Sequence, residues 1–187
     1  NGTAGASTVS VSYAGLNANT TIVFIPEYPK ILITNLLSSN ITAINASNGK
    51  ETTFSNFSLP ESIAASSNGT IAYIAVSGNK VKMLNLLNGN VIGSIKVGSY
   101  PSAILDENGY LYIANSGSNN VTIARENGSI VESISTGIFP DYEAASGNGA
   151  YVFVLNLLSE NVTEWFSVVA GICWTYSIRD FLQFEAK

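Results

Sequence analysis

Histidine is absent from this chain of 187 residues, and cysteine occurs once, at Cys173. The usual ligand sets for zinc and haem, Cys-His dyads and Ser-His-Asp triads are therefore excluded, as is an intrachain disulfide. We expect no cofactor and no metal site. Because Cys173 lies in an apolar run, we expect it to be a small buried side chain.

Charge is also scarce, at 11% of the residues, and the eight basic residues are scattered along the chain instead of forming a stripe. Against 13 acidic residues they give a formal net charge of −5. Binding to nucleic acid depends on a concentrated positive surface, so we expect no nucleic-acid partner.

Long apolar runs are missing too. The longest uncharged run near the end, residues 165–178, has 14 residues, fewer than the ~18 that a membrane span needs. We therefore expect no membrane span, and expect this apolar C-terminal segment to be a buried strand or short helix. Apolar residues nevertheless make up 46% of the chain, and Gly, Ser, Thr and Asn supply most of the rest, which suits short strands joined by polar turns.

A repeat of about 40 residues organises the sequence. Pro60, Pro101 and Pro140 each precede an Asn-Gly pair, at residues 68–69, 108–109 and 148–149. An aromatic-rich run follows each pair, and then a polar turn. In most copies this turn reads Asn-x4-Asn-(Ile/Val)-Thr, at residues 35–42, 115–122 and 156–163, with a degenerate copy at 76–81.

A second series of Asn-Gly pairs, at 48–49, 88–89 and 127–128, lies midway between the first. Asn-Gly provides the positive φ angles that a two-residue hairpin requires, so each repeat is predicted to hold four strands. In the clearest copy these are Ser102–Asp106, Tyr110–Asn115, Asn120–Arg125 and Ile130–Ser135. The prediction is an all-β fold, a β-propeller of about four four-stranded antiparallel blades. The alternative, a β-sandwich, gives no reason for the same residues to return in register.

We expect one domain, residues 1–187, with blades at about 20–57, 58–98, 99–137 and 138–178. Residues 1–19 and 179–187 are then terminal segments that close the ring or are exchanged between chains. Ser7–Tyr13 alternates like a strand. We expect it to pair with the C-terminal strands, and the alternative is addition to the open edge of a neighbouring subunit.

The repeat from Gly98 to Ile123 resembles those of the YVTN family, which is named for its Tyr-Val-Thr-Asn strand. The nearest matches are Tyr112–Asn115 and Leu32–Asn35, and the family's Gly-x-x-Pro motif matches Gly98–Pro101 and Gly137–Pro140. The resemblance covers roughly residues 26–164. It implies a surface-layer or secreted propeller, common in archaea, that serves in adhesion, envelope architecture or partner binding and has no shared catalytic residues. Complete members usually close a ring of about seven blades.

Asn-x-Ser/Thr sequons favour an exterior glycoprotein, and a chain without a leading Met suits a mature secreted protein or a fragment. The nine candidate glycosylation sites are Asn1, Asn19, Asn40, Asn45, Asn56, Asn68, Asn120, Asn127 and Asn161. The alternative is that repeated turn sequences inflate the count.

Carboxylates are the only plausible catalytic groups, namely Asp106, Glu107, Asp141 and Glu143. They lie at turns between strands, where acidic side chains are usually only solvated. The leading hypothesis is therefore a non-catalytic, glycosylated, extracellular propeller, either a structural or appendage subunit or an adhesion module. Its partners would be copies of itself, other envelope proteins, or glycans. The alternative is a hydrolase or lyase that acts on polysaccharides through paired carboxylates.

Overall fold

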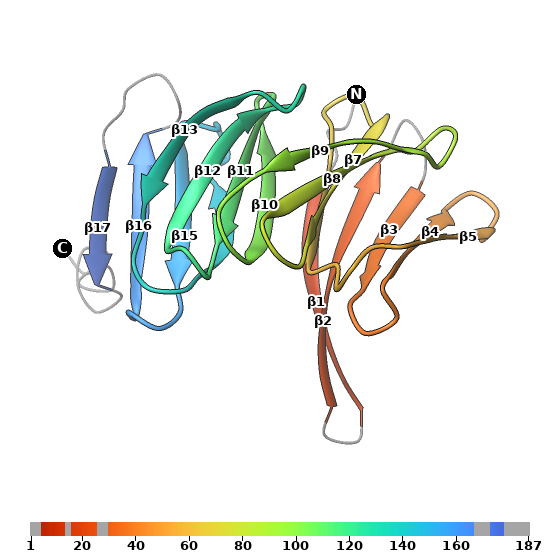
Figure 1. The fold of residues 1–187 in the computed structure, drawn as a ribbon, viewed down its shortest axis with the longest axis horizontal. Helices are drawn as coiled ribbons and strands as arrows, with labels where there is room; N and C mark the ends of the chain where they lie inside the picture. Colours follow the sequence, from red (N-terminus) through yellow and green to blue (C-terminus); the bar gives the residue numbers. More distant parts are fainter. Residues whose placement is uncertain (1–4, 14–15, 26–29, 167–172, 178–187) are drawn as a thin grey trace. The chain divides into compact units, whose positions relative to one another are not determined.

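The computed structural model is built of β-strands in four antiparallel sheets (Figure 1). It describes residues 5–13, 16–25, 30–166 and 173–177, with side chains described for 30–164. The first sheet contains β1 (Gly5–Tyr13), β2 (Leu16–Ile25), β3 (Lys30–Asn35), β4 (Asn40–Asn45) and β5 (Glu51–Ser55). The second contains β6 (Ser62–Ala65), β7 (Ile71–Val76), β8 (Lys80–Asn85) and β9 (Val91–Lys96).

The third sheet contains β10 (Pro101–Glu107), β11 (Tyr110–Asn115), β12 (Asn120–Arg125) and β13 (Ile130–Ser135). The fourth contains β14 (Pro140–Ala145), β15 (Tyr151–Asn156), β16 (Asn161–Phe166) and β17 (Cys173–Ser177). In each sheet the strands follow one another in chain order. The predicted all-β architecture of repeated antiparallel blades is confirmed. Within the ranges described, no helix has the length and hydropathy needed to cross a bilayer.

The strands of the third sheet match the prediction closely. β11, β12 and β13 have the predicted bounds, and β10 extends one residue beyond the prediction at each end. The first-series pairs at Asn68, Asn108 and Asn148 all lie between the first and second strands of their sheets, at equivalent corners. The repeat in the sequence is therefore a repeat of structure.

The chain forms two compact units, an N-terminal unit (Asn1–Val97) and a C-terminal unit (Gly98–Lys187). In the N-terminal unit, buried side chains of the first and second sheets form one core, which includes Leu32, Ile41, Ile63, Ile74 and Leu84. In the C-terminal unit, β14 packs beside β10 and β11, and a core forms from Tyr112, Val121, Ile123, Val152 and Val154. In the third sheet, β11 and β12 are buried on both faces, whereas β13 is mostly exposed.

The Asn-Gly turns differ from the prediction of two-residue hairpins. Only Asn108 and Gly109 both have positive φ, 54° and 78°, and they join Glu107 directly to Tyr110. In the other five pairs only the glycine has positive φ. There the Asn side chain accepts a hydrogen bond from the backbone N–H two residues on, at 2.9–3.1 Å. These asparagines form Asx turns in longer loops, which satisfy the backbone without a left-handed Asn.

The expected pairing of Ser7–Tyr13 with the C-terminal strands stays a prediction. These residues belong to β1, which pairs along its length with β2, from Gly5 opposite Phe24 to Tyr13 opposite Leu16. The first sheet consequently has five strands instead of four. Pairing with the next segment closes a short loop, which has a much smaller entropic cost than pairing with a strand more than 150 residues away. In the C-terminal segment, Cys173–Ser177 forms β17 against β16.

The Asn-x4-Asn-(Ile/Val)-Thr motif is a buried hydrogen-bond network that ties the second strand of a sheet to the third. The Nδ2 of Asn156 donates to Asn161 Oδ1 and to Thr163 Oγ1, both at 2.8 Å. Asn115 makes the same pair of bonds to Asn120 and Thr122, both at 3.0 Å, and Asn35 makes them to Asn40 and Thr42, at 2.7 and 2.8 Å. Asn115 and Asn156 are fully buried, so the motif is a device of the fold.

The glycine of each Gly-x-x-Pro motif packs against this network. A Cβ at Gly98 would meet Ser118 Oγ and would lie 2.6 Å from Asn120 Oδ1 and 2.7 Å from Asn115 Cβ. A Cβ at Gly137 would meet the equivalent Ser159, Asn161 and Asn156. Glycine is required there because any side chain would displace the buried network.

Candidate functional site

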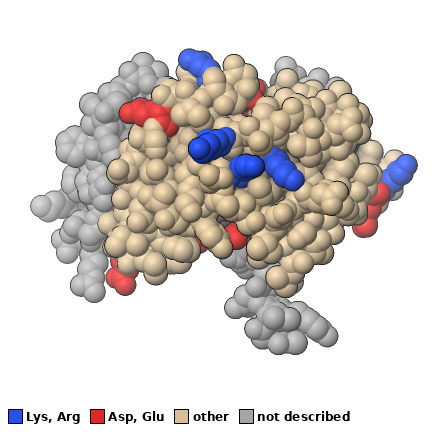
Figure 2. Space-filling model, in the orientation of Figure 1, with Lys and Arg blue, Asp and Glu red and all other residues tan. Residues whose placement is uncertain are grey.

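Three lysines on β8 and β9, Lys80, Lys82 and Lys96, form what we call the lysine patch. Lys80 lies directly opposite Lys96, and Lys82, two residues along β8, shares their face of the sheet. Like charges directly opposite one another destabilise a strand pair. Figure 2 shows basic side chains gathered on one face in the region of β8 and β9, without acidic side chains between them. The Lys80–Lys96 pair therefore does not stabilise the sheet, and its presence must have another cause.

The patch coincides with the degenerate copy of the repeat. Val76 and Lys80 are partners across β7 and β8, as Asn115 and Asn120 are across β11 and β12. Lys80 and Lys82 thus take the positions of the network's second Asn and its Thr. Lys82 instead donates from Nζ to the Asn56 carbonyl at 2.7 Å and lies over the Phe57 ring. In the second sheet, Lys80 and Lys82 thus replace two polar residues of the hydrogen-bond network.

Within residues 30–164 none of these three lysines forms an ion pair, and Lys80 and Lys96 are exposed. Exposed lysines on an edge strand can serve to prevent aggregation. That explanation covers Lys96, on the edge strand β9. It does not cover Lys80 and Lys82, which lie on the interior strand β8, and these remain candidates for binding.

The two units differ sharply in charge. The N-terminal unit has five basic and three acidic residues, a net charge of +2, whereas the C-terminal unit has three basic and ten acidic residues, a net charge of −7. The net charge of the whole chain, −5, does not show this difference between the units. The difference appears only when the charges are counted for each unit separately, which requires the boundary between the units.

The outer strands also expose apolar side chains. Val91 and Ile92 on β9 are about half exposed, as are Ile130 and Val131 at the start of β13. β9 and β13 are edge strands of their sheets. Edge strands with apolar side chains present both unpaired backbone groups and surface that association could bury.

Of the predicted carboxylates, Asp106 has the most unusual surroundings. Burial raises its pKa to about 8, and the charge and hydrogen bond of Glu126 and the charge of Glu107 act in the same direction, while the Gly109 backbone opposes them. Glu126 lies at the β12–β13 turn, where its N–H reaches the Gly109 carbonyl at 3.4 Å. Glu126 is not among the carboxylates predicted from the sequence, because it is distant from Asp106 along the chain and the two residues come from adjacent turns. At neutral pH the Asp106 carboxyl therefore keeps its proton.

Asp141 and Glu143 lie on β14. Burial raises the pKa of both carboxyls, and for Glu143 the Leu105 backbone opposes only part of the change. The structure thus brings Asp106 together with Glu126 and does not pair it with Asp141. Carboxylates that the sequence placed at solvated turns are in fact partly or fully withdrawn from water.

The sequons divide into two structural classes, with Asn1 and Asn19 outside the described side chains. Asn40, Asn120 and Asn161 belong to the buried network, and their sequon threonines accept its hydrogen bonds. Asn56, Asn68 and Asn127 are exposed, and Asn45 is half-buried. At Asn68 and Asn127 the Oδ1 accepts the sequon's own backbone N–H and hydroxyl, at 2.7–3.0 Å. The Nδ2 that a glycan would join takes part in none of these bonds.

This division predicts which asparagines carry glycans. We expect glycopeptide mass spectrometry of the native protein to find sugar at Asn56, Asn68 and Asn127. We expect Asn120 and Asn161 to be unmodified, because their Oδ1 atoms and sequon hydroxyls are engaged in the network. A glycan on Asn120 or Asn161 would contradict this assignment, and unmodified Asn56, Asn68 and Asn127 would remove the evidence for glycosylation.

No family model matches the sequence, and no curated protein matches it. Among solved structures, the chain is similar to a streptogramin B lyase (TM-score 0.72, 14% identity), covering 91% of this chain and 65% of that one. It is similar to Kuenenia stuttgartiensis hydrazine synthase (TM-score 0.69, 21% identity), covering 79% and 46%. It is also similar to a putative 6-phosphogluconolactonase from Bacteroides uniformis (TM-score 0.64, 20% identity), covering 82% and 52%.

These three are β-propeller proteins, and the chain spans between about half and two thirds of their lengths. At such identities the likeness concerns the fold alone. Together with the four repeated antiparallel sheets, it shows that this chain has a β-propeller fold.

Proposed function

We propose that this chain is a non-catalytic, secreted propeller of the YVTN type that serves as a structural subunit of a cell surface or appendage by associating with copies of itself. The observation that carries the proposal is the division of charge: a unit of +2 that bears the lysine patch is joined to a unit of −7. Units of opposite net charge favour heterologous contacts, in which the basic unit of one copy meets the acidic unit of another. Such contacts generate closed rings or open filaments.

The exposed surface supports the same proposal. The lysine patch supplies long-range attraction and register for an acidic unit of a second copy. The apolar side chains on the edge strands β9 and β13 supply area whose burial stabilises the contact. Glycans at the exposed sequons would keep the remaining surface hydrated.

The association is expected to depend on salt and on the lysine patch. In sedimentation velocity experiments at low ionic strength the full chain should form species larger than a monomer. These should dissociate as added salt shortens the Debye length to below about 10 Å. Lys80→Glu should weaken association roughly tenfold, because it reverses an exposed charge on the interior strand β8 that faces the acidic partner.

The matched control is Lys50→Glu, which changes the charge of the same unit by the same amount outside the patch. Equal weakening by both substitutions would show that only net charge matters and would reject the patch as an interface. A chain that stays monomeric at every salt concentration would reject self-association.

A polysaccharide hydrolase or lyase remains the second candidate because Asp106 and Glu126 form a carboxyl pair with one raised pKa. A carboxyl whose pKa is raised toward neutrality can act as the general acid toward a glycosidic oxygen. Turnover of a polysaccharide that is lost in Asp106→Asn would favour this candidate over the structural one.

A further inference from the structure

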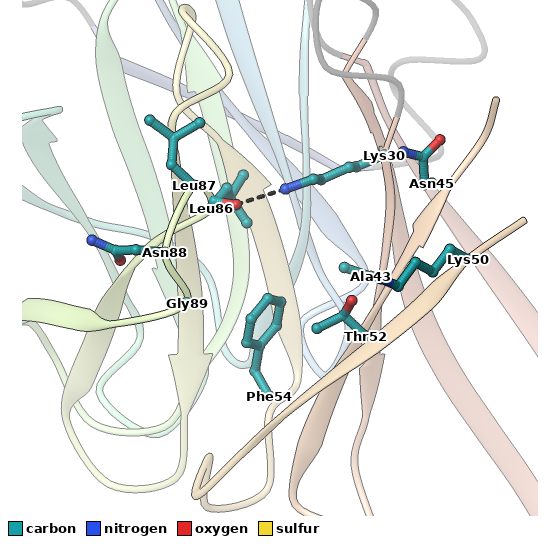
Figure 3. Close-up of a pocket in the computed structure, with 10 residues that line it drawn as sticks. All are labelled: Lys30, Ala43, Asn45, Lys50, Thr52, Phe54, Leu86, Leu87, Asn88 and Gly89. Carbon is teal, nitrogen blue, oxygen red and sulfur yellow. Dashed lines mark hydrogen bonds between the residues drawn. The ribbon is translucent and has the colours of Figure 1, made fainter. Parts of the chain in front are cut away.

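A pocket of about 260 Å³ lies in the N-terminal unit, beside the first sheet and the turn between β8 and β9 (Figure 3). Lys30, at the start of β3, and Lys50, just before β5, line it together with Phe54 of β5. Figure 3 shows Lys30 reaching toward the Leu86 carbonyl and Lys50 extending alongside Ala43. The pocket shares no residue with the lysine patch or the carboxyl pair.

The charged groups that line the pocket are both ammonium donors, Lys30 and Lys50. Lys30 Nζ donates to the Leu86 carbonyl at 2.6 Å, which holds the ammonium in the wall and leaves its other N–H groups for a ligand. Lys50 has no ion pair or hydrogen bond from its ammonium within residues 30–164. The Oδ1 of Asn45 accepts the Ser47 N–H at 2.9 Å, and its Nδ2 is a further donor. Among the residues that the structure describes, no carboxylate lines the pocket. A ligand must therefore supply acceptors and negative charge.

Part of the lining is apolar. The Phe54 ring packs on Gly89, where a Cβ would lie 2.7 Å from Cε1 of the ring. Gly89 also has a φ of 77°, a conformation that favours glycine. The turn thus requires glycine both for its positive φ and for the close approach of the Phe54 ring. The absence of a side chain lets the ring lie directly against the backbone. Leu86 and Leu87 extend this apolar surface.

We infer that this pocket binds an acidic sugar, a single monosaccharide unit that carries a carboxylate. Two ammonium groups match the carboxylate as charge-assisted donors. The aromatic face matches the apolar C–H face of a sugar ring. The volume lies just below the roughly 300–1,000 Å³ of sites for drug-sized ligands, as one sugar unit requires.

Inorganic phosphate fits this pocket less well, although it shares the negative charge. Phosphate sites are built from helix N-termini or from concave runs of backbone N–H groups. The lining here provides flexible ammonium groups and an aromatic wall that a phosphate cannot use. The inference is independent of self-association, because the two surfaces have different residues.

The test is isothermal titration of the full chain with D-galacturonate, with neutral D-galactose and with inorganic phosphate. We expect saturable binding of D-galacturonate and at least tenfold weaker binding of the other two. Lys50→Gln should weaken D-galacturonate binding roughly tenfold through loss of one charge-assisted contact. Lys50 is exposed, so this variant is expected to fold normally.

Lys96→Gln is the matched control, since it removes the same charge from the same unit outside the pocket, and it should leave binding unchanged. Absence of saturable D-galacturonate binding would overturn the inference, as would equal weakening by the two substitutions. Equal affinity for phosphate would reduce the pocket to an unspecific anion site and overturn the assignment to a sugar.

Discussion

Replacing Asp106 with Asn is expected to raise the free energy of unfolding at pH 7 by about 3 kcal/mol. Burial and the neighbouring Glu126 raise the pKa of this carboxyl from 3.8 to about 8. At pH 7 the Asp106 carboxyl is therefore protonated in the folded state and ionised in the unfolded chain. The free energy that the unfolded chain gains by releasing this proton lowers the stability of the fold. At pH 7, which lies 3.2 pH units above 3.8, this free energy corresponds to roughly 4 kcal/mol at 1.36 kcal/mol per pH unit, which we reduce for partial solvent exposure. Asn keeps a donor for Glu126 and has no proton to lose.

The pH dependence has a definite sign. Between about pH 4 and pH 8 the folded state binds more protons than the unfolded state, so stability falls as pH rises. Below pH 4 both states are protonated and the penalty vanishes, and above pH 8 it is constant. The raised pKa values of Asp141 and Glu143 act in the same direction. The protein should be most stable in acid.

Urea unfolding at pH 4.5, 6 and 7.5, followed by tryptophan fluorescence, measures this dependence. Asp106→Asn should flatten the decline in stability, whereas Glu132→Gln, a substitution on the exposed strand β13, should change stability by less than about 0.5 kcal/mol. If the wild-type chain were equally stable at all three values, Asp106 would be ionised in the fold. The carboxyl pair and the candidate catalytic role would then both be untenable.

Replacing Gly98 or Gly137 with Ala is expected to destabilise the fold by about 2–3 kcal/mol. At both positions a methyl group would enter the space of the Asn network, in contact with a serine hydroxyl and two Asn side chains. The network joins the second and third strands, so its displacement also loosens their pairing. For a domain of this size the melting temperature should fall by roughly 5–10 °C.

Gly147→Ala is the matched control, because a Cβ at Gly147 meets nothing within 4 Å. It should be neutral or slightly stabilising. Thermal unfolding of the three variants under one condition compares them directly. If Gly98→Ala or Gly137→Ala had the same melting temperature as Gly147→Ala, the packing of these glycines against the network would not contribute to stability.

The sequence predicted the elements far better than the sites. The bounds of β11, β12 and β13 followed from residues that recur in register, because strand alternation and turn chemistry are local properties of the chain. The same local reasoning overestimated the Asn-Gly turns. Five of the six asparagines instead accept a backbone hydrogen bond with their side chains. Local sequence does not predict this, because it depends on the length of the loop.

The function of the Asn-x4-Asn-(Ile/Val)-Thr motif was beyond the sequence for a related reason. Its spacing was visible, and three of its copies were read as sequons. Only the pairing of Asn156 with Asn161 across β15 and β16 shows that the residues bond to one another. The carboxyl pair was missed similarly, because Asp106 and Glu126 come from different turns.

By itself the sequence determined the repeat, the strand order within each sheet and the scarcity of groups for metal or nucleophilic chemistry, since periodicity and composition need no contacts. Tertiary structure alone decided which polar groups lose water, which lysines face one another and which strand β1 joins. Burial, cross-strand register and loop closure are properties of segments brought together in space, and they set the pKa of Asp106, the lysine patch and the pocket beside Phe54.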